Sequence, residues 1–463
     1  MNNHKTTRTR IAPSPTGANL HIGNLYTALI NYTVAKKNNG QFIVRIEDTD
    51  RARLVEGAEA KILSTLESFG IHYDESPNLD GPFGPYRQSD RLDIYQKYAH
   101  ELVEKKKAYY CFCSKERLDT LRKSQQEEKK TPRYDKHCLH ADIDADKKIK
   151  NGEPYVLRLN VEQNTTVTFE DLIRGEIEFS TNEIDDQVLI KSDGYPTYHM
   201  AVVIDDHLME ISHIIRAEEW ISSTPKHVLL YAAFGWELPI FAHVPILRNP
   251  DRSKLSKRKN PVWANEYLEL GYLQEAVLNY LALMGWSHPD EKEIFSLDEY
   301  IQVFELSDIK PAGPIFDRDK LTWMNGEYIR LLSDAELKRK LFVFDTSLQS
   351  LDGEILDAFI PLAKTRIKTL SEFKSLVSPF IQRNPCDLEE SDANNRDILL
   401  NVLTETSEWN GETVLAALKQ FIQIVPGKNF KYLYTIVIGA DSGLPLVDVF
   451  VILGKAKTLE LLS

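Results

Sequence analysis

Cysteine and long hydrophobic runs are both scarce in this sequence. Four cysteines among 463 residues are too few for a disulfide framework. The longest apolar stretches, such as VDVFVILG, run about eight residues, whereas a membrane-spanning helix needs about 20. The first ten residues, MNNHKTTRTR, are polar and precede no apolar segment, which predicts that no secretory signal is present. The sequence therefore predicts a cytoplasmic protein without membrane spans.

Internal repeats and long low-complexity segments are also absent, and the overall composition is that of a globular protein. Apolar residues make up 42% and charged residues 27% of the chain. Its length predicts two to four domains. The net charge of −13 argues against a nonspecific nucleic-acid coat but leaves a local basic groove open.

The chain opens with a predicted strand–helix–strand unit. TRTRIA is the expected first strand, and apolar residues then recur at helical spacing from Leu25 to Ala35, with Gly40 ending the helix. QFIVRIEDTD alternates apolar and polar residues, which predicts a second strand. This order is typical of a doubly wound α/β unit, in which ligands bind at the carboxyl ends of the strands.

The pattern changes three times further along the chain. Residues 111–140 form a charged excursion with a helix-like middle, Ser114 as its cap and a break at Thr131-Pro132. Short strands are predicted between 153 and 204, and HIIRAEEWISSTPKHVLLYAAFGW returns to strand plus helix. From about 333 the chain is mostly helical, with DGEILDAFIPLAKTRIKTL and TVLAALKQFIQI as periodic stretches. We expect a nucleotide-binding α/β domain that is interrupted by an insertion and followed by a helical domain.

The segment APSPTGANLHIGN, residues 12–24, is a candidate phosphate-binding turn. Pro13 and Pro15 fix φ, and Gly17 and Gly23 permit close backbone approach. His21 enters a helix whose free N–H groups and dipole attract phosphate. A histidine beside a glycine is more often structural, so this motif alone supports both interpretations.

A second candidate is the basic segment DRSKLSKRKN, residues 251–260, in which five basic residues face one aspartate. Most charge runs are solvated surface loops. Lys254 and Lys257, which flank Ser256, also suit a pyrophosphate leaving group, where charge builds in the transition state.

Three of the four cysteines lie within 28 residues of polar sequence. Cys111 and Cys113 form C-x-C, and Cys138 and His140 form C-x-H. Three thiolates and one imidazole are a standard tetrahedral zinc set, so we predict a structural Zn²⁺ site. His137 is a rival for the fourth position. Separate buried cysteines are the alternative, and Cys386 stands alone as an expected core residue.

The two phosphate motifs together carry a family resemblance. PSPTGANLHIG and KLSKR resemble the signature motifs of class I aminoacyl-tRNA synthetases. RIEDTD, DGYPTYH, IIRAEEW and WMNGEYIR resemble the bacterial glutamyl-tRNA synthetases in particular. The resemblance runs from residue 8 to about 330 and continues more weakly to the end. The family usually has two residues between the glycine and the histidine, whereas three separate Gly17 from His21, so we expect this loop to bulge.

The resemblance implies a class I Rossmann-type catalytic domain with an α+β insertion, followed by an all-helical anticodon-binding domain. It divides the catalytic domain into residues 1–86 and 200–250, with an acceptor-binding insertion at 87–199. The KLSKR loop and a stem-contact region follow at 251–332, and the anticodon-binding domain at 333–463. The implied reaction uses ATP with Mg²⁺ to form glutamyl-adenylate and then charges tRNA(Glu). We expect a monomer.

The resemblance also implies roles for individual residues. The expected catalytic residues are His21, Lys254 and Lys257, and the expected ATP-binding residues are His21, Gly23, Glu219, Trp220 and Lys257. The expected glutamate-binding residues are Arg10, Ala12, Ser14, Glu47, Tyr198 and Arg216. Arginine offers a planar fork of donors that fits a carboxylate. The two arginines and Tyr198 are therefore expected at the side-chain carboxylate, and the other three at the α-amino and α-carboxylate groups.

Arg366, in PLAKTRIKTLSEF, is the expected anticodon reader on a helix. Glutamate and glutamine anticodons differ at the third base, C against G. Arginine can donate to O2 and N3 of an unpaired cytosine, whereas guanine presents donors there. A phosphate contact is the alternative role, and whether tRNA(Gln) is also charged stays open.

Three other functions share part of this pattern. Glutamyl-queuosine synthetases resemble only the catalytic half, so the helical residues after 333 argue against that assignment. An inactive RNA-binding paralogue would not need His21, Lys254 and Lys257. A class I nucleotidyltransferase acting on a small metabolite would not need the extra domains.

Overall fold

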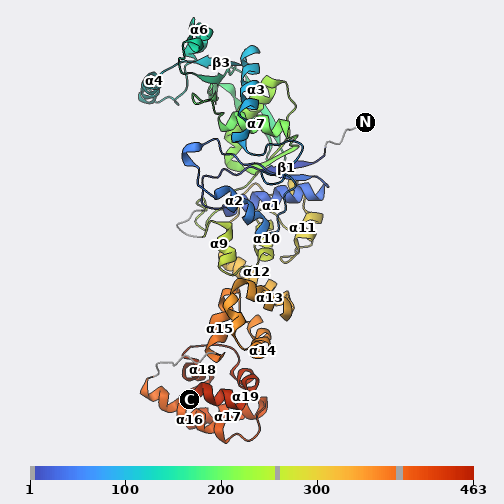
Figure 1. The fold of residues 1–463 in the computed structure, drawn as a ribbon, viewed down its shortest axis with the longest axis vertical. Coiled ribbons are helices and arrows are strands. Elements are labelled where there is room, and N and C mark those ends of the chain that lie inside the picture. The colour runs from blue at the N-terminus through green and yellow to red at the C-terminus, as the bar shows by residue number, and fades with distance from the viewer. Residues whose placement is uncertain (1–5, 256–260, 382–388) are drawn as a thin grey trace. The chain divides into compact units, whose positions relative to one another are not determined.

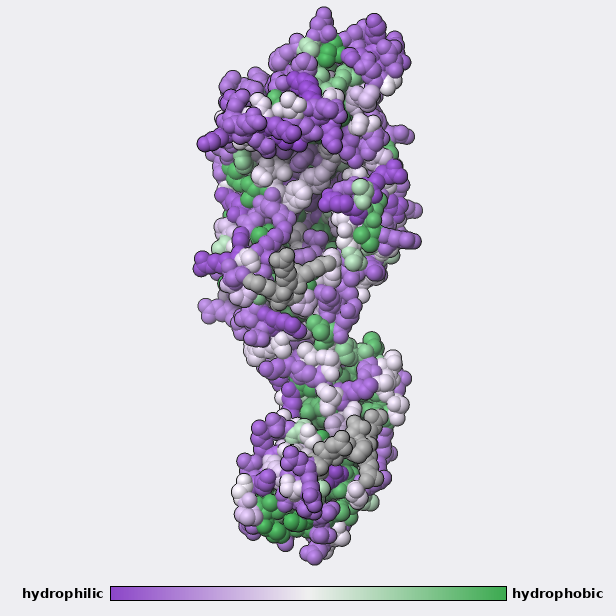
Figure 2. Space-filling model, turned by 90° about the vertical axis from the view of Figure 1, so that its left-hand side faces the viewer, coloured by the Kyte–Doolittle hydropathy of each residue, from purple (hydrophilic) through white to green (hydrophobic). Residues whose placement is uncertain are grey.

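The computed structural model describes residues 6–255, 261–381 and 389–463 of the chain. It divides into two compact units (Figure 1). The first comprises Met1–Asn265 and Leu278–Asp317, and the second comprises Glu266–Val277 and Arg318–Ser463. Hydrophilic side chains dominate the face drawn in Figure 2, and apolar ones gather in separate patches. None of the described helices is long and apolar enough to cross a bilayer.

The first unit begins with the predicted strand–helix–strand arrangement. Strands β1 (Arg8–Ile11) and β2 (Gln41–Val44) are parallel, and helix α1 (Ile22–Lys37) connects them. Every residue of α1 from Leu25 to Ala35 is buried, which places this helix in the core. Gly40 is required at the return to β2, because a Cβ there would lie 2.0 Å from the backbone oxygen of Thr7. The prediction for residues 8–44 is confirmed.

The following segment contains helices and short antiparallel strands. The helices are α2 (Ala58–Ser68), α3 (Leu92–Glu104), α4 (Lys115–Glu127), α5 (His137–His140) and α6 (Ala145–Lys150). One sheet has the order β3-β4-β7, from β3 (Ala108–Cys111), β4 (Val156–Leu159) and β7 (Val188–Ile190). A hairpin joins β5 (Thr166–Asp171) to β6 (Gly175–Ser180). Ser114 caps α4 as predicted, since its side chain accepts from the backbone N–H of Arg117.

The α/β pattern resumes with a helix where strands were predicted. Helix α7 (Tyr198–Leu208) is followed by β8 (His213–Ala217), the 3-10 helix η4 (Glu218–Ser223), α8 (Thr224–Phe234) and β9 (Ile240–Val244). Strands β8 and β9 are parallel in a sheet of order β6-β5-β9-β8. The prediction that strands extend to residue 204 was wrong at α7. Residues 200–206 are all buried, and a continuous buried run has no periodicity that separates helix from strand.

Short helices complete the region between the α/β core and residue 317. They are α9 (Ala264–Glu269), α10 (Gln274–Ala282) and α11 (Leu297–Val303). Leu278–Asp317 belongs to the first unit, and Glu266–Val277 belongs to the second.

The second unit is helical, as predicted. Its helices are α12 (Arg318–Leu331), α13 (Asp334–Phe344), α14 (Gly353–Lys364), α15 (Ser371–Ile381), α16 (Glu390–Glu405), α17 (Gly411–Ile424), α18 (Phe430–Ile438) and α19 (Leu446–Leu462). Helices α16, α17 and α19 pack together around apolar residues such as Leu418 and Phe450 (Figure 1). The periodic stretch DGEILDAFIPLAKTRIKTL, expected to be helical, is helical only in part, because α14 ends at Lys364 and a turn precedes α15.

Candidate active site

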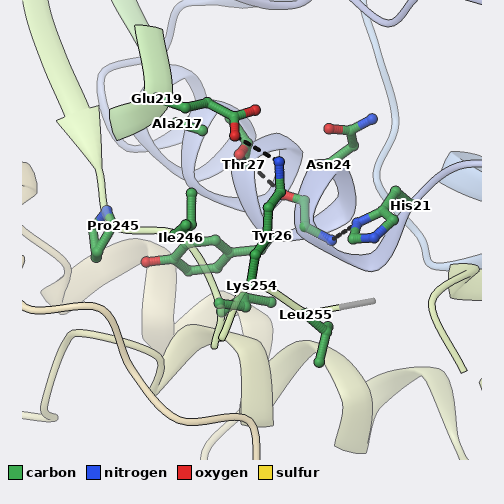
Figure 3. Close-up of a pocket in the computed structure, with 12 residues that line it drawn as sticks. His21, Asn24, Tyr26, Thr27, Ala217, Glu219, Pro245, Ile246, Lys254 and Leu255 are labelled. Atoms are coloured by element: carbon green, nitrogen blue, oxygen red, sulfur yellow. Dashed lines mark hydrogen bonds and ion pairs between the residues drawn. The ribbon is translucent and has the colours of Figure 1, made fainter. Parts of the chain in front are cut away.

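The amino-terminal end of α1 forms one wall of a cavity of about 250 Å³ (Figure 3). His21 caps this helix, because its Nδ1 accepts from the backbone N–H of Gly23 at 3.0 Å. In a neutral imidazole this arrangement leaves the proton on Nε2. With three residues between Gly17 and His21, the imidazole still occupies the capping position. The free N–H groups and partial positive charge of the helix end make this wall suitable for phosphate.

Lys254 extends across the cavity toward Glu219 (Figure 3). Its Nζ lies 2.6 Å from Oε2 of Glu219, and both side chains are exposed. Exposed ion pairs contribute at most about 1 kcal/mol, so an anionic ligand can displace Glu219 from Lys254. Lys257, the other predicted catalytic lysine, lies outside the described residues.

Trp220, an expected ATP-binding residue, is not among the residues that line this cavity. The cavity is lined by His21, Gly23, Asn24, Tyr26, Thr27, Ala217, Glu219, Pro245, Ile246, Leu247, Lys254 and Leu255. The Trp220 ring instead packs on Tyr198, with the ring centroids 4.5 Å apart. The contact partner of Trp220 is thus a residue expected to bind glutamate.

Two adjacent buried carboxylates on α7 anchor the neighbouring arginines. Asp206 accepts from Arg10 Nε at 3.0 Å and Nη2 at 3.1 Å, and from Arg45 Nη1 at 2.8 Å. Burial alone would raise the pKa of Asp206, but Arg10 and Arg45 hold it below its usual value. Asp205 accepts from Arg91 Nε at 2.7 Å. The fork of Arg10 is therefore already occupied by a protein carboxylate.

Arg216, on β8, is also buried, yet all its contacts are to neutral acceptors. Its Nε donates to Nε2 of His243 at 3.1 Å, and its Nη2 donates to Thr224 Oγ1 at 2.8 Å. Its Nη1 contacts Nδ1 of His227 at 3.2 Å and Tyr198 Oη at 3.4 Å. Among the described residues, no carboxylate forms a hydrogen bond or ion pair with Arg216. Burial lowers the pKa of this guanidinium. Arg216 is thus a buried cation without a contacting counter-charge.

The remaining predicted glutamate ligands follow the neighbouring strands. Glu47 lies beyond the end of β2, is 8% exposed, and accepts from Arg45 at 3.1 Å. Burial raises its pKa to about 7. Burial also raises the pKa of Tyr198. Among the nearby charges, Arg216 and Arg10 lower this pKa and Glu47 raises it. These four side chains therefore share one electrostatic environment at the carboxyl ends of β1, β2 and β8, where α/β proteins bind ligands.

Ala12 and Ser14 follow β1, and Ser14 is exposed. The sequence analysis did not identify Asp206, Arg45 or His243. One signal was available for the first of these: adjacent carboxylates inside the apolar run MAVVIDDHL predict a buried, paired role, since unpaired charges are rarely buried.

The three predicted metal-binding cysteines converge. Their Sγ atoms all lie within 4.8 Å of one another, and those of Cys113 and Cys138 are 3.5 Å apart. Thiolates bound tetrahedrally to one zinc at about 2.3 Å lie about 3.8 Å apart, so the cluster fits Zn²⁺. Neither His137 nor His140 places a ring nitrogen within this group.

Tyr134 is the residue that meets the three cysteines in the structure. Its Oη lies 3.3 Å from Cys111 Sγ and 3.4 Å from Cys113 Sγ, and it accepts from the backbone N–H of Cys138 at 2.9 Å. The spacing of cysteine and histidine along the chain gave no indication of Tyr134. Cys386 lies outside the described residues.

Arg366 lies in the turn between α14 and α15, which corrects its predicted placement on a helix. Its backbone N–H donates to the carbonyl of Ala363 at 2.8 Å. The side chain is exposed and has no hydrogen-bond or ion-pair partner in the described part of the chain. It is therefore accessible to a ligand.

The capped amino-terminal end of α1 at the cavity, the buried arginines of the first unit and the helical second unit are typical of a nucleotide-binding α/β protein. Residues 6–323 match the family described as tRNA synthetases class I (E and Q), catalytic domain. Residues 329–463 match the family described as anticodon binding domain. The chain belongs to the class I tRNA synthetases (E and Q) and is an ATP-dependent aminoacyl-tRNA ligase.

Curated relatives and solved structures agree with this family. The glutamate–tRNA ligase of Fusobacterium nucleatum is 41% identical, and the alignment covers 98% of this chain and 96% of the relative. That of Pseudoalteromonas translucida is 49% identical, covering 81% of this chain and 75% of the relative. The crystal structure of a glutamate tRNA ligase from Elizabethkingia meningosepticum in complex with its amino acid is similar, with a TM-score of 0.88 and 33% identity. It covers 99% of this chain and 98% of that chain.

Proposed function

We propose that this chain is a glutamate–tRNA ligase that activates L-glutamate with ATP and transfers it to the 3′-terminal adenosine of tRNA(Glu). In the first step the α-carboxylate of glutamate attacks the α-phosphorus of ATP. The bond from that phosphorus to the bridging oxygen breaks, which forms glutamyl-adenylate and releases pyrophosphate. A ribose hydroxyl of the terminal adenosine then attacks the acyl carbon and displaces AMP.

The observation that carries this proposal is the buried Arg216, whose contacts are all neutral. A buried charge is unfavourable unless it is paired, so this cation favours binding of an anion. Four of its five N–H donors have acceptors, and one N–H of Nη2 is left for a ligand. The side-chain carboxylate of glutamate supplies the missing negative charge, and Tyr198 donates its hydroxyl proton to the same group.

Arg10 has a different role in this proposal from the one expected at first. Asp206 accepts from Nε and from one N–H of Nη2, which leaves the second N–H of Nη2 and those of Nη1 for other acceptors. Nη1 lies 3.4 Å from the carbonyl oxygen of Ile215, which is a weak contact that a carboxylate can replace. Arg10, whose charge Asp206 neutralises, therefore contributes hydrogen bonds from its remaining N–H groups, and Arg216 contributes the uncompensated charge. The carboxylate of Glu47 accepts a hydrogen bond from the α-ammonium group, and Ala12 and Ser14 lie beside the α-carboxylate.

The ATP phosphates bind at the start of α1. His21 donates from Nε2, Gly23 permits close approach, and Lys254 leaves Glu219 to contact the phosphates. Lys257 adds charge to the leaving pyrophosphate, and Trp220 with Glu219 borders the nucleotide. Mg²⁺ accompanies ATP and neutralises part of the phosphate charge. This assignment requires no acid–base residue at the attacking carboxylate, since it is already ionised at neutral pH.

The cysteine cluster holds a structural Zn²⁺ in this proposal. Cys111, Cys113 and Cys138 supply three thiolates. His140 stays the predicted fourth ligand, but it must reorient to bind because its ring nitrogens lie outside the group. The Tyr134 oxygen already touches two of the sulfurs and competes for that position.

The remaining assignments concern tRNA binding, localisation and oligomeric state. Residues 87–199 bind the acceptor end, residues 251–332 contact the stem, and residues 333–463 bind the anticodon, with Arg366 as its reader. The enzyme acts as a cytoplasmic monomer.

Charging assays with purified tRNA(Glu) test the proposed function directly. Labelled glutamate should enter acid-precipitable tRNA only when ATP is present, and labelled glutamine should not. Activation is measured separately by ATP–pyrophosphate exchange with tRNA present. Exchange or charging that proceeds equally well with glutamine would contradict the assignment of Arg216 to a carboxylate.

A further inference from the structure

A buried Asp–His pair lies directly behind Arg216. Asp171, the last residue of β5, and His243, on β9, are both fully buried. Nδ1 of His243 lies 2.6 Å from Oδ2 of Asp171, and Nε2 of the same ring lies 3.1 Å from Nε of Arg216. The pair therefore connects the β5–β6 hairpin to the guanidinium that is proposed to bind glutamate.

The hydrogen bonds of Asp171 determine which nitrogen of His243 carries the proton. Oδ1 of Asp171 accepts from the backbone N–H groups of Ile173 and Arg174, at 3.0 and 3.1 Å. Oδ2 accepts from the backbone N–H of His243 at 3.0 Å. With all its other partners donating, the carboxylate acts as an acceptor toward Nδ1 as well. His243 thus has its proton on Nδ1 and turns the lone pair of Nε2 toward Arg216.

A second imidazole holds the opposite side of Arg216. Nδ1 of His227 lies 3.2 Å from Arg216 Nη1, and its Nε2 lies 3.0 Å from Nδ1 of His199. Burial, with Arg216 nearby, keeps the pKa of His227 well below its usual value, and burial lowers that of His243. Both rings are therefore neutral acceptors that orient the guanidinium without cancelling its charge.

We propose that Asp171, acting through His243, is a positioning residue that keeps Arg216 oriented and without a contacting counter-charge, and so sets the preference for a carboxylate over an amide. The inference rests on the proposed function of Arg216. Nε2 of His243 also lies 3.1 Å from Thr224 Oγ1. If His243 carried its proton on Nε2, that proton would face Arg216 or turn to Thr224, and in either case the lone pair that accepts from Arg216 would be lost. An aspartate in direct contact with Arg216 would orient it equally well but would neutralise it, as Asp206 does with Arg10.

Asp171→Asn is the discriminating variant, because it keeps the size of the side chain. Its amide oxygen can still accept from the turn at Ile173 and Arg174. Its NH₂ group takes the place of Oδ2, so it loses the bond from the backbone N–H of His243, donates to Nδ1 and shifts the proton of His243 to Nε2. The KM for glutamate should rise roughly ten- to a hundredfold, because buried donors are left facing each other. The KM for ATP should change less than about threefold, since the nucleotide wall contains neither residue.

Asp186→Asn is the matched control. Asp186 is 2% exposed, but it contacts Tyr109 and Lys136 rather than a histidine. This variant should lose thermal stability without a change in the KM for glutamate or in the glutamate-to-glutamine ratio. A similar rise in KM in both variants would mean that the effect is a general loss of stability, and it would overturn the proposal.

Two further measurements do not depend on the folding of Asp171→Asn. In ¹⁵N-histidine-labelled wild type, the resonance lost in His243→Gln should show a protonated Nδ1 and an unprotonated Nε2. A protonated Nε2 would refute the proposal. His243→Gln itself carries an acceptor that can reach Arg216, so its KM for glutamate should stay within about fivefold of wild type, and Asp171→Asn should add little in that background.

The assay separates this inference from the proposed function. If wild type does not charge tRNA with glutamate, the proposed function is wrong. If wild type does so and Arg216→Gln abolishes it, but Asp171→Asn leaves the KM and the amino-acid preference unchanged, the function stands and the positioning role of Asp171 is wrong.

Discussion

Arg216 and Arg10 should respond in opposite ways to the same substitution. Both are buried arginines at the glutamate side of the site, with 5% and 4% exposure. Arg10 forms a two-pronged ion pair with Asp206, whereas Arg216 contacts neutral groups. Substitution by glutamine removes the charge in each case and keeps a hydrogen-bonding side chain, so the difference between the variants reports the role of each charge.

The expected changes in the free energy of unfolding follow from the groups that each arginine contacts. Breaking a buried ion pair by removing one member destabilises a protein by about 3–5 kcal/mol, which we expect for Arg10→Gln because Asp206 keeps only Arg45. Arg216→Gln breaks no ion pair, and burial already disfavours its charged form. Its free energy of unfolding should therefore fall by less than that of Arg10→Gln, because the substitution removes hydrogen bonds to neutral groups but leaves no buried carboxylate without its partner.

For kcat/KM with glutamate, we expect the reverse order, with the larger loss in Arg216→Gln. A substrate carboxylate in this buried site loses its cationic partner in Arg216→Gln, and about 3–5 kcal/mol corresponds to a fall of roughly two to three and a half orders of magnitude in kcat/KM for glutamate. The measurements are urea unfolding and tRNA charging at varied glutamate, with the KM for ATP as the internal control. If Arg216→Gln unfolded as readily as Arg10→Gln, or charged glutamate normally, the argument from its neutral partners would be refuted.

Four further outcomes are expected. Lys257→Ala should slow adenylate formation by more than about a hundredfold, because it removes charge aimed at the transition state, and a near-normal kcat in exchange assays would contradict that role. Zinc should copurify at close to one ion per chain and be lost in Cys138→Ser; metal analysis under reducing conditions that finds no zinc would exclude the site. Because burial raises the pKa of Glu47 to about 7, the KM for glutamate should fall as the pH rises through that value, and Glu47→Gln should remove the dependence. Because the pKa of Glu47 is higher in the folded protein than in the unfolded chain, the folded state holds a proton that the unfolded state has already released. The contribution of Glu47 to stability therefore declines between about pH 5 and 7. Arg366→Gln should narrow the difference in kcat/KM between tRNA(Glu) and tRNA(Gln); an unchanged ratio would show that Arg366 is not the reader.

Local sequence patterns were sufficient for much of the fold. The spacing of apolar residues located β1, α1 and β2, and Ser114 marked the start of α4, because capping and periodicity depend only on neighbours in the chain. The same reasoning failed at α7, where a fully buried run has no periodicity. It also failed at Arg366, where α14 ends without a glycine after Lys364 and the residues that follow keep a helix-like composition.

Short local motifs were enough to indicate the class of site: a histidine at the start of a helix, a lysine-rich segment and a cluster of three cysteines. The pairing of the charges, in contrast, could be seen only in the folded chain. Asp206 lies 196 residues from Arg10 in the chain, and Asp171 lies 72 residues from His243, yet each pair forms buried hydrogen bonds. No local pattern encodes such pairing, since it depends on which strand ends and helices the fold brings together. For that reason two arginines that looked equivalent in the sequence differ in the structure: Arg10 is neutralised by Asp206, whereas Arg216 contacts only neutral groups among the described residues.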